Sequence, residues 1–147
     1  MIVLFAAACS DDAEPAKTAP LFPLADYAAS YQVVRDCRTS IDHDLSHVRV
    51  LASPEAVGAY TLRNEQFPVG AILVKEQYAD DGCTELEGFS VMKREPNGYA
   101  PGAGDWHWQR VSKGGSVELD GKLPTCTGCH KGCGVPPDGH DWTCAVP

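Results

Sequence analysis

The sequence predicts an α+β fold in which a predominantly antiparallel β-sheet is flanked by helices. Short segments rich in β-branched residues are separated by loops, and one segment has the start signal of a helix, a serine N-cap followed by proline. The chain also carries 14 glycines and 11 prolines among 147 residues, which leaves no room for a bundle of four long helices. A hydrophobic fraction of 44% is sufficient for one ordinary core, so we expect a single domain over residues 24–147.

Two helices are expected in the first half of the chain. Residues 25–37 carry apolar side chains at helical spacing, which predicts an amphipathic helix. Ser53 is a favourable N-cap residue, and Pro54 suits the first helical position because an N–H there would have no helical partner. These two residues predict a second helix that runs to about Asn64.

Four strands are expected after the second helix. Residues 71–78 are rich in β-branched side chains, and residues 89–95 follow as a second strand across a long loop. Residues 105–111 alternate large aromatic and polar side chains, which is the pattern of a strand with one buried face. Residues 116–121 predict a fourth strand, and together these segments form an antiparallel sheet.

The charge balance argues against nucleic acid as a partner. The chain carries 12 basic and 20 acidic side chains, a net charge of −8, and no run of four basic residues occurs. Binding to a phosphate backbone requires clustered Lys and Arg. The acidic surface instead favours a basic protein partner, through electrostatic steering.

The first residues predict an export signal. Residues 1–9 are apolar and uncharged, and polar, proline-containing chain follows abruptly. The segment is similar to the end of a bacterial lipoprotein signal, in which the cysteine, here Cys9, receives lipid. Residues 10–23 would then be a flexible tether, and the mature protein would lie in the periplasm or cell envelope. An ordinary secretory leader is the alternative, and contact with the membrane is expected only through a lipid anchor.

Cys126, Cys129 and His130 form a C-x-x-C-H motif, which is typical of covalent haem attachment. Two thiols at this spacing reach the two vinyl groups of one haem, and the imidazole reaches the iron on the proximal face. The expected cofactor is therefore one haem c, held by a C-terminal segment of the fold. A thioredoxin-like site lacks its usual βαβ context. The other alternative is a zinc site, with ligands from Cys126, Cys129, Cys133 and either His140 or Cys144.

The remaining cysteines suit disulfides. Once the lipid and haem cysteines are set aside, four of the seven cysteines are left, and an oxidising compartment favours their pairing. Cys133 with Cys144 is the favoured local pair. Cys37 with Cys83 would then join the first helix to a loop between strands, although other pairings stay open from the sequence.

The order of these motifs resembles the cytochrome P-460 family and its relative cytochrome c′-beta, which are β-rich monohaem proteins with C-x-x-C-H near the end. The resemblance covers roughly residues 25–144, and the haem motif is its specific part. The other segments add weight as an ordered series. The segments are His47–Val50, Phe67–Glu76, Val91–Lys93, Trp106–Trp108 and Cys126–His130.

The resemblance implies roles for two further residues. In the hydroxylamine-oxidising members, a strand lysine is linked covalently to the haem edge and an arginine lies near the distal pocket; by position these would be Lys75 and Arg49. Lys75 shares a strand face with Ala71 and Leu73. If that face turns toward the core or the haem, the ammonium must be neutralised or bonded there; the equal alternative is a lysine that reaches solvent at a strand end. The alternative for Arg49 is an ion pair with a carboxylate. This chain departs from the family pattern at Val69, where Asp is common.

No residue stands out as a sixth iron ligand, which predicts an open or weakly occupied distal site. Met92 is the one methionine after the leader, and core packing is the commoner role for it. Four histidines are further candidates, each more typical of a surface or turn: His43, His47, His107 and His140. Three carboxylates are the proton acceptors expected nearest the site: Glu76, Glu95 and Asp105.

The leading functional hypothesis is an exported monohaem protein that oxidises a small nitrogen compound such as hydroxylamine. Electrons would leave singly through the haem to a redox partner protein. One alternative is a non-enzymatic haem protein that binds NO or CO, as c′-beta does. Another is a simple electron-transfer cytochrome, which would need a sixth ligand such as Met92. The resemblance also implies that a homodimer can form.

Overall fold

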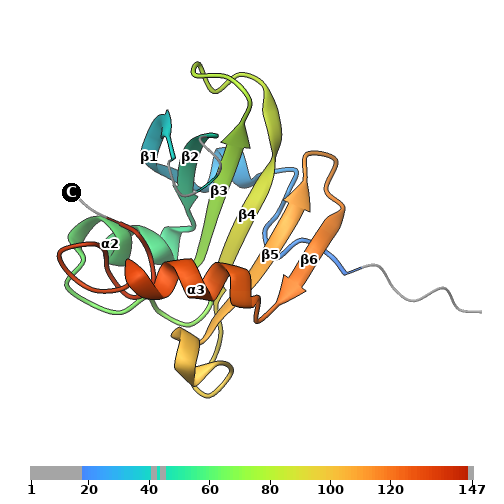
Figure 1. The fold of residues 1–147 in the computed structure, drawn as a ribbon. Coiled ribbons are helices and arrows are strands. Elements are labelled where there is room, and N and C mark those ends of the chain that lie inside the picture. The colour runs from blue at the N-terminus through green and yellow to red at the C-terminus, as the bar shows by residue number, and fades with distance from the viewer. Residues whose placement is uncertain (1–17, 41–42, 44–45, 146–147) are drawn as a thin grey trace, which may run out of the picture.

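The computed structural model describes residues 18–40, 43 and 46–145. Within these residues, six strands form one antiparallel sheet whose order follows the chain from β1 to β6 (Figure 1). The strands are β1 (Gln32–Thr39), β2 (His47–Ala52), β3 (Ile72–Tyr78), β4 (Leu86–Arg94), β5 (Trp106–Ser112) and β6 (Val117–Gly121). The helices are α1 (Tyr27–Ser30), α2 (Pro54–Leu62) and α3 (Pro124–Gly132), with a 3-10 turn at Pro101–Ala103. The predicted α+β class, mostly antiparallel sheet with flanking helices, is confirmed.

Most of the predicted elements are present. Strands β3 to β6 occupy the four segments that the sequence predicts, and α2 begins at Pro54. Ser53 precedes this helix as expected, but its hydroxyl accepts a hydrogen bond from Ile72 N (3.0 Å) instead of capping the helix. Arg63 ends the helix in the left-handed conformation, with φ of 53°. Ser53 therefore ties the start of α2 to the start of β3.

The helix predicted over residues 25–37 is wrong. The structure has only the four-residue α1 there, and β1 begins at Gln32. β1 pairs along its length with β2, from Gln32 opposite Ala52 to Thr39 opposite His47. The ladder with β2 supplies hydrogen bonds to the backbone that a local helical spacing of apolar residues does not reveal, so tertiary pairing overrides the sequence pattern.

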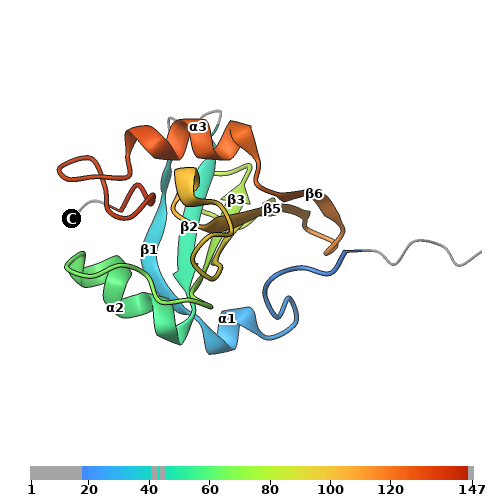
Figure 2. The same cartoon turned by 90° about the horizontal axis from the view of Figure 1, so that it is seen from below.

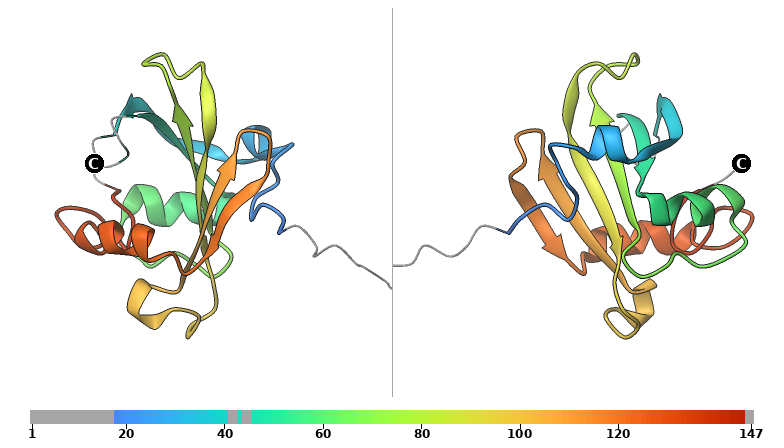
Figure 3. Two further views of the ribbon diagram at one scale, coloured as in Figure 1. Left: turned by 45° about the vertical axis from the view of Figure 1, so that its right-hand side comes forward. Right: turned by 180° about the vertical axis from the view of Figure 1, so that it is seen from behind.

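The two faces of the sheet carry different layers. Figure 2 shows α3 and α1 on opposite sides of the sheet, and the view from behind in Figure 3 shows α1 lying over the strands. We call the α3 side the front face and the α1 side the back face. The back face is closed by a small apolar cluster, which consists of Phe22, Val74, Phe89, Val91 and Val111.

The N-terminal end of the described chain belongs to this back layer. Phe22 is buried against Phe89, and Leu21 N donates a hydrogen bond to the side chain of Gln109 (2.8 Å). Residues 18–23 are therefore part of the packed domain, although the sequence analysis assigned them to a flexible tether. The predicted export signal and its Cys9 lie outside the described residues.

A larger apolar cluster lies on the front face. It joins α2 to the strands through Ala56, Ala59 and Tyr60, and it extends to Phe67 and to Trp106 at the start of β5. No helix among the described residues is long and apolar enough to cross a membrane.

Cys37 and Cys83 form a disulfide that spans 46 residues of the chain. This is the pairing that the sequence analysis favoured, but Cys37 lies on β1 and not on a helix. The bond joins the outer strand β1 to the loop between β3 and β4. It therefore fastens one edge of the sheet to a hairpin that lies two strands away.

Candidate haem-binding site

A cavity of about 540 Å³ lies between α3 and the front face of the sheet. Its volume falls in the range of small-molecule and cofactor sites. The apolar part of its wall comes from four neighbouring strands, through Val48, Val50, Leu73, Met92 and Trp108. Period-two alternation along each strand explains this wall, because every second side chain faces the front.

Helix α3 places the C-x-x-C-H motif on the other side of this cavity. Pro124 occupies the first turn of the helix, where a missing N–H costs nothing. Cys126 and Cys129 are three residues apart, so their thiols lie on one side of the helix, and both line the cavity. Both are free thiols, and burial raises the pKa of the Cys126 thiol.

His130 is buried at the end of the same helix and also lines the cavity. Its Nδ1 lies 2.8 Å from the carbonyl oxygen of Trp142, and its ring packs edge-on against Trp108 at 4.6 Å between centroids. Because a carbonyl only accepts hydrogen bonds, Nδ1 carries the proton. The neutral ring then has its lone pair on Nε2, which is the arrangement of a metal-binding histidine with an outer hydrogen-bond partner.

One buried polar atom of the cavity wall also suits a bound group. Trp108 Nε1 is buried and has no hydrogen-bond partner among the described residues. A buried N–H of this kind costs free energy unless an acceptor reaches it. The propionate carboxylates of a haem are acceptors of this kind, so the wall, the two thiols and the oriented imidazole fit a covalently held haem.

The zinc alternative is not assembled in the structure. Cys133 and Cys144 form a disulfide, which is the local pair that the sequence analysis favoured. Their sulfur atoms lie within 4.8 Å of His130, but bonded sulfurs are not thiolate ligands. His140 does not line the cavity, and its Nε2 lies against the carbonyl oxygen of Glu65 (2.5 Å). The four ligands that a zinc site needs are therefore not brought together.

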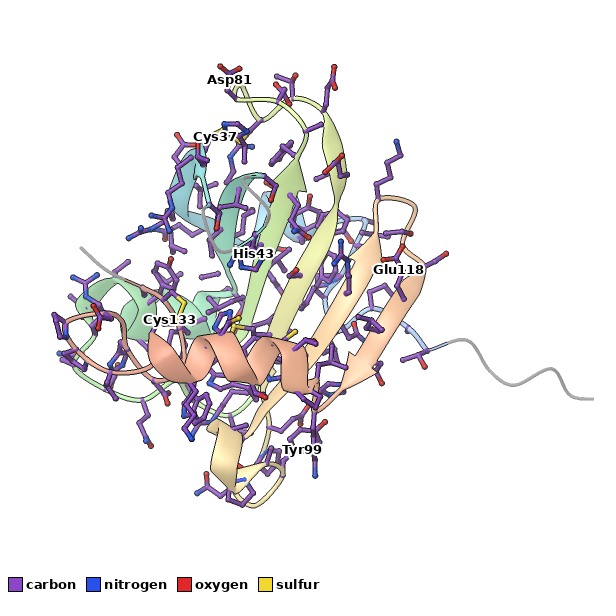
Figure 4. The ribbon with its side chains drawn as sticks, in the orientation of Figure 1. Cys37, His43, Asp81, Tyr99, Glu118 and Cys133 are labelled. Carbon is purple, nitrogen blue, oxygen red and sulfur yellow. A yellow bond between two sulfur atoms is a disulfide. The ribbon has the colours of Figure 1, made fainter. Side chains whose placement is uncertain are left out.

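Lys75 lines the same cavity as the haem motif. It shares the front face of β3 with Leu73 and Gln77, as the sequence analysis expected from its spacing. Its Nζ lies 2.7 Å from Nε2 of His43, which also lines the cavity. In Figure 4, His43 lies over the front of the sheet, above α3. Strand β3 and the connection between β1 and β2 thus bring a lysine and a histidine to the cavity that the two thiols and His130 line.

Arg49 does not reach the cavity. Val48 and Val50 on either side of it line the cavity, so Arg49 extends from the back face. There its guanidinium lies 3.6 Å from Glu76 and 3.3 Å from Asp36. The expectation that Arg49 lies near a distal pocket is therefore wrong. The structure instead has the alternative, an ion pair between Arg49 and carboxylates.

The carboxylates considered as proton acceptors also lie elsewhere. Glu76 is buried on the back face, Glu95 pairs with Lys93 (2.9 Å), and Asp105 accepts a hydrogen bond from Ala100 N (2.7 Å). Among the described residues that line the cavity, none is acidic.

The iron-ligand candidates divide in the same way. Met92 lines the cavity and so does His43, whereas His47, His107 and His140 do not. His107 on β5 lies instead between the carboxylates of Asp120 (2.8 Å) and Glu95 (3.5 Å). Only two of the five candidates are therefore in reach of a group bound in the cavity.

Several polar cavity residues were missed by the sequence analysis. Gln77 and Ser90 could have been found from alternation, because each shares a strand face with a residue already singled out. Arg38 and Ser40 could not, because residues 32–37 of the strand that leads to them were predicted as helix. The polar residues missed are Arg38, Ser40, Gln77, Ser90, Gln109, Arg110, Thr125 and Thr143.

A β-rich fold with this motif and cavity defines a c-type haem protein. A comparison with models of protein families matches residues 25–136 to cytochrome P-460. The chain belongs to the cytochrome P-460 family, and its cofactor is a single, covalently attached haem c. No curated protein matches the chain.

Proposed function

We propose that Cys126 and Cys129 hold the haem through thioether bonds and that His130 Nε2 is the proximal ligand of the iron. All three residues line one cavity, and the hydrogen bond from His130 Nδ1 to Trp142 sets the tautomer that this role requires. Replacing both cysteines with alanine should leave no haem attached after acid–acetone extraction. His130→Ala should keep the haem attached but change the axial ligation in the absorption spectrum.

We further propose that the protein oxidises a small nitrogen compound such as hydroxylamine, with an open distal site and with Lys75 linked to the haem edge. The observation that carries this proposal is that Lys75 lines the same cavity as the attachment motif. When bound, the haem supplies an iron that accepts electrons from a substrate one at a time. The chain supplies Lys75 and its neighbour His43, whose nitrogens lie 2.7 Å apart.

His43 is the titratable side chain on the cavity wall best suited to take a proton from a bound substrate. Oxidation of hydroxylamine releases protons as well as electrons, so a proton acceptor in reach of the substrate accelerates it. The carboxylates first considered for this role lie outside the cavity, whereas His43 lines it.

The deciding experiment compares Lys75→Ala with Lys93→Ala, each produced with the c-type haem maturation machinery. Both lysines lie on strands of the sheet, but Lys93 pairs with Glu95 outside the cavity. The parent and Lys93→Ala should show a broad, strongly red-shifted ferrous Soret band and turn over hydroxylamine. Lys75→Ala should show an ordinary c-type spectrum and lose the turnover. A parent with an ordinary high-spin spectrum would overturn the cross-link.

A non-enzymatic NO or CO binder is the second candidate function. The observation that favours it is the apolar wall formed by Val48, Val50, Leu73 and Met92, with no acidic residue among the described cavity lining. An apolar, carboxylate-free distal side suits uncharged diatomic ligands. Tight CO binding to the ferrous protein without any hydroxylamine turnover would favour this function over the oxidase.

A simple electron carrier would use Met92 as its sixth ligand, since Met92 lines the cavity. Met92→Ala distinguishes this role. An unchanged spectrum and reduction potential would remove methionine ligation, whereas loss of a low-spin spectrum would support it.

We also propose that the protein is exported to the periplasm or cell envelope and anchored through lipid on Cys9. The two disulfides support an oxidising compartment. A basic redox partner protein and a homodimer complete the proposal. Mass spectrometry of the N-terminal peptide after expression in the native host tests the lipid, since a cleaved, unlipidated N-terminus would contradict it.

A further inference from the structure

A buried ion pair connects the sheet to the segment that contacts His130. Arg94 lies at the end of β4, and Asp141 lies in the C-terminal loop that follows α3; their side chains are 7% and 6% exposed. Arg94 Nη1 lies 3.1 Å from Asp141 Oδ1 and 3.0 Å from Oδ2. Asp141 Oδ2 also accepts a hydrogen bond from Phe67 N (2.9 Å). One carboxylate thus ties the C-terminal loop to two separate parts of the front face.

The backbone of this loop is held in an unfavourable conformation. Asp141 has φ of 44° and Trp142 has φ of 66°, so two consecutive residues with side chains occupy the left-handed region. That region is a genuine outlier for a bulky residue such as tryptophan. Such conformations persist only where surrounding contacts determine them, and they gather at ligand clamps and functional sites.

The contacts around the loop account for this conformation. Trp106 Nε1 donates a hydrogen bond to the carbonyl oxygen of Asp141 (3.1 Å), and Cys144 is bonded to Cys133 at the end of α3. The carbonyl of the next residue, Trp142, is the acceptor for His130 Nδ1 at 2.8 Å. The chain of contacts therefore runs from Arg94 through Asp141 and Trp142 to His130.

We propose that Arg94 and Asp141 are positioning residues for the proximal histidine: they hold the Trp142 carbonyl where it accepts the Nδ1 proton of His130. This inference rests on the proposed ligation of the iron by His130. A histidine that donates its outer N–H to an acceptor becomes a more basic ligand. A more basic proximal ligand strengthens the iron–histidine bond and favours the ferric state. The ion pair thereby lowers the reduction potential of the haem without touching it.

The test compares Asp141→Asn with Glu76→Gln in the haem-loaded protein. Both changes neutralise a buried carboxylate that faces an arginine, but Glu76 lies on the back face, where its partners are Arg49, Tyr27 and Tyr78. Asp141→Asn should lower the iron–histidine stretching frequency in the resonance Raman spectrum of the ferrous protein and raise the reduction potential. Glu76→Gln should leave both values at those of the parent. Equal values in the parent and in Asp141→Asn would overturn the inference.

A second pair of variants keeps the test decisive if Asp141→Asn does not fold. Arg94→Lys retains the cation beside Asp141, whereas Arg94→Met removes it with little change in volume. Values near the parent in Arg94→Lys together with a shifted frequency and potential in Arg94→Met support a positioning role. Unshifted values in both variants overturn it. A parent protein without attached haem would instead overturn the proposed attachment itself, so the two failures are distinguishable.

Discussion

Lys75 and Glu76 are consecutive residues of β3 whose side chains lie on opposite faces of the sheet. Lys75 lines the cavity on the front face, whereas Glu76 is buried on the back face and is 5% exposed. The Glu76 carboxylate accepts hydrogen bonds from Tyr27 Oη (2.6 Å) and Tyr78 Oη (2.7 Å). Strand β3 therefore has the cavity on one face and, on the other, a hydrogen-bonded cluster of Tyr27, Glu76 and Tyr78 that holds α1 against the sheet.

The first prediction concerns this cluster. Glu76→Gln replaces a carboxylate oxygen with an amide N–H₂. The amide group cannot accept a hydrogen bond from a tyrosine hydroxyl and carries no charge to pair with the guanidinium of Arg49. We expect the free energy of unfolding to fall by about 1–3 kcal/mol, the usual cost of disrupting a buried, charge-assisted hydrogen-bond network. Urea unfolding monitored by circular dichroism measures this change. An unfolding midpoint equal to that of the parent would show that Glu76 contributes no net stability.

The second prediction concerns alkaline pH. Burial and the Glu76 carboxylate raise the pKa of both Tyr27 and Tyr78 well above 10. Since the unfolded chain loses these protons first, the folded state holds more protons above pH 10. We expect the stability to be constant with respect to these two groups below about pH 10 and to fall as the pH rises above it. In the double variant Tyr27→Phe/Tyr78→Phe, the free energy of unfolding should fall less steeply with pH between pH 9 and 11. Urea unfolding at each pH measures it, and equal slopes in parent and variant would contradict the raised pKa values.

The third prediction concerns close packing in the C-terminal loop. A Cβ atom at Gly139 would collide with the backbone carbonyl oxygens of Cys133 and Thr143, whereas a Cβ at Gly102 would meet nothing within 4 Å. Gly139→Ala should therefore lower the melting temperature, at a cost of about 1–3 kcal/mol or more for an overpacked site. Gly102→Ala is the matched control and should melt close to the parent. Similar melting temperatures for the two variants would contradict the predicted clash.

The fourth prediction concerns the disulfide between Cys37 and Cys83. Replacing both residues with serine removes a cross-link that closes a span of 46 residues. Chain entropy alone predicts a loss of about 4 kcal/mol in the free energy of unfolding. Because neither residue lines the cavity, the haem absorption spectrum should stay unchanged. A variant that unfolds with the same midpoint urea concentration as the parent would contradict the prediction.

Strands β3 to β6, helix α2 and the strand face that Lys75 shares with Leu73 could all be predicted from the sequence. Each depends on a local signal, such as Pro54 after Ser53 or the alternation of side chains that places Leu73 and Lys75 on one face. The attachment motif is equally local, since its three functional residues lie within five positions of the chain.

The errors arose where pairing between distant segments decides the structure. Residues 32–37 form a strand because β2 lies beside them, and their own spacing favoured a helix. Arg49 was placed by resemblance alone. Because successive side chains of a strand point to opposite faces, Arg49 lies on the face of β2 opposite to Val48 and Val50, which line the cavity. The link from Arg94 to His130 passes through a loop whose backbone conformation has no signature in the sequence.

The sequential order of the sheet bears on how the molecule assembles. Each strand pairs with the next one along the chain, so every pairing in the sheet joins segments that are consecutive in the sequence. A topology without crossovers between distant strands favours fast folding. Helix α3 follows all six strands, and a chain made from its N-terminus presents the strands first. We therefore expect the apolar wall of the cavity to exist before Cys126 and Cys129 emerge, so that the cofactor is joined to a chain whose receiving surface is already formed.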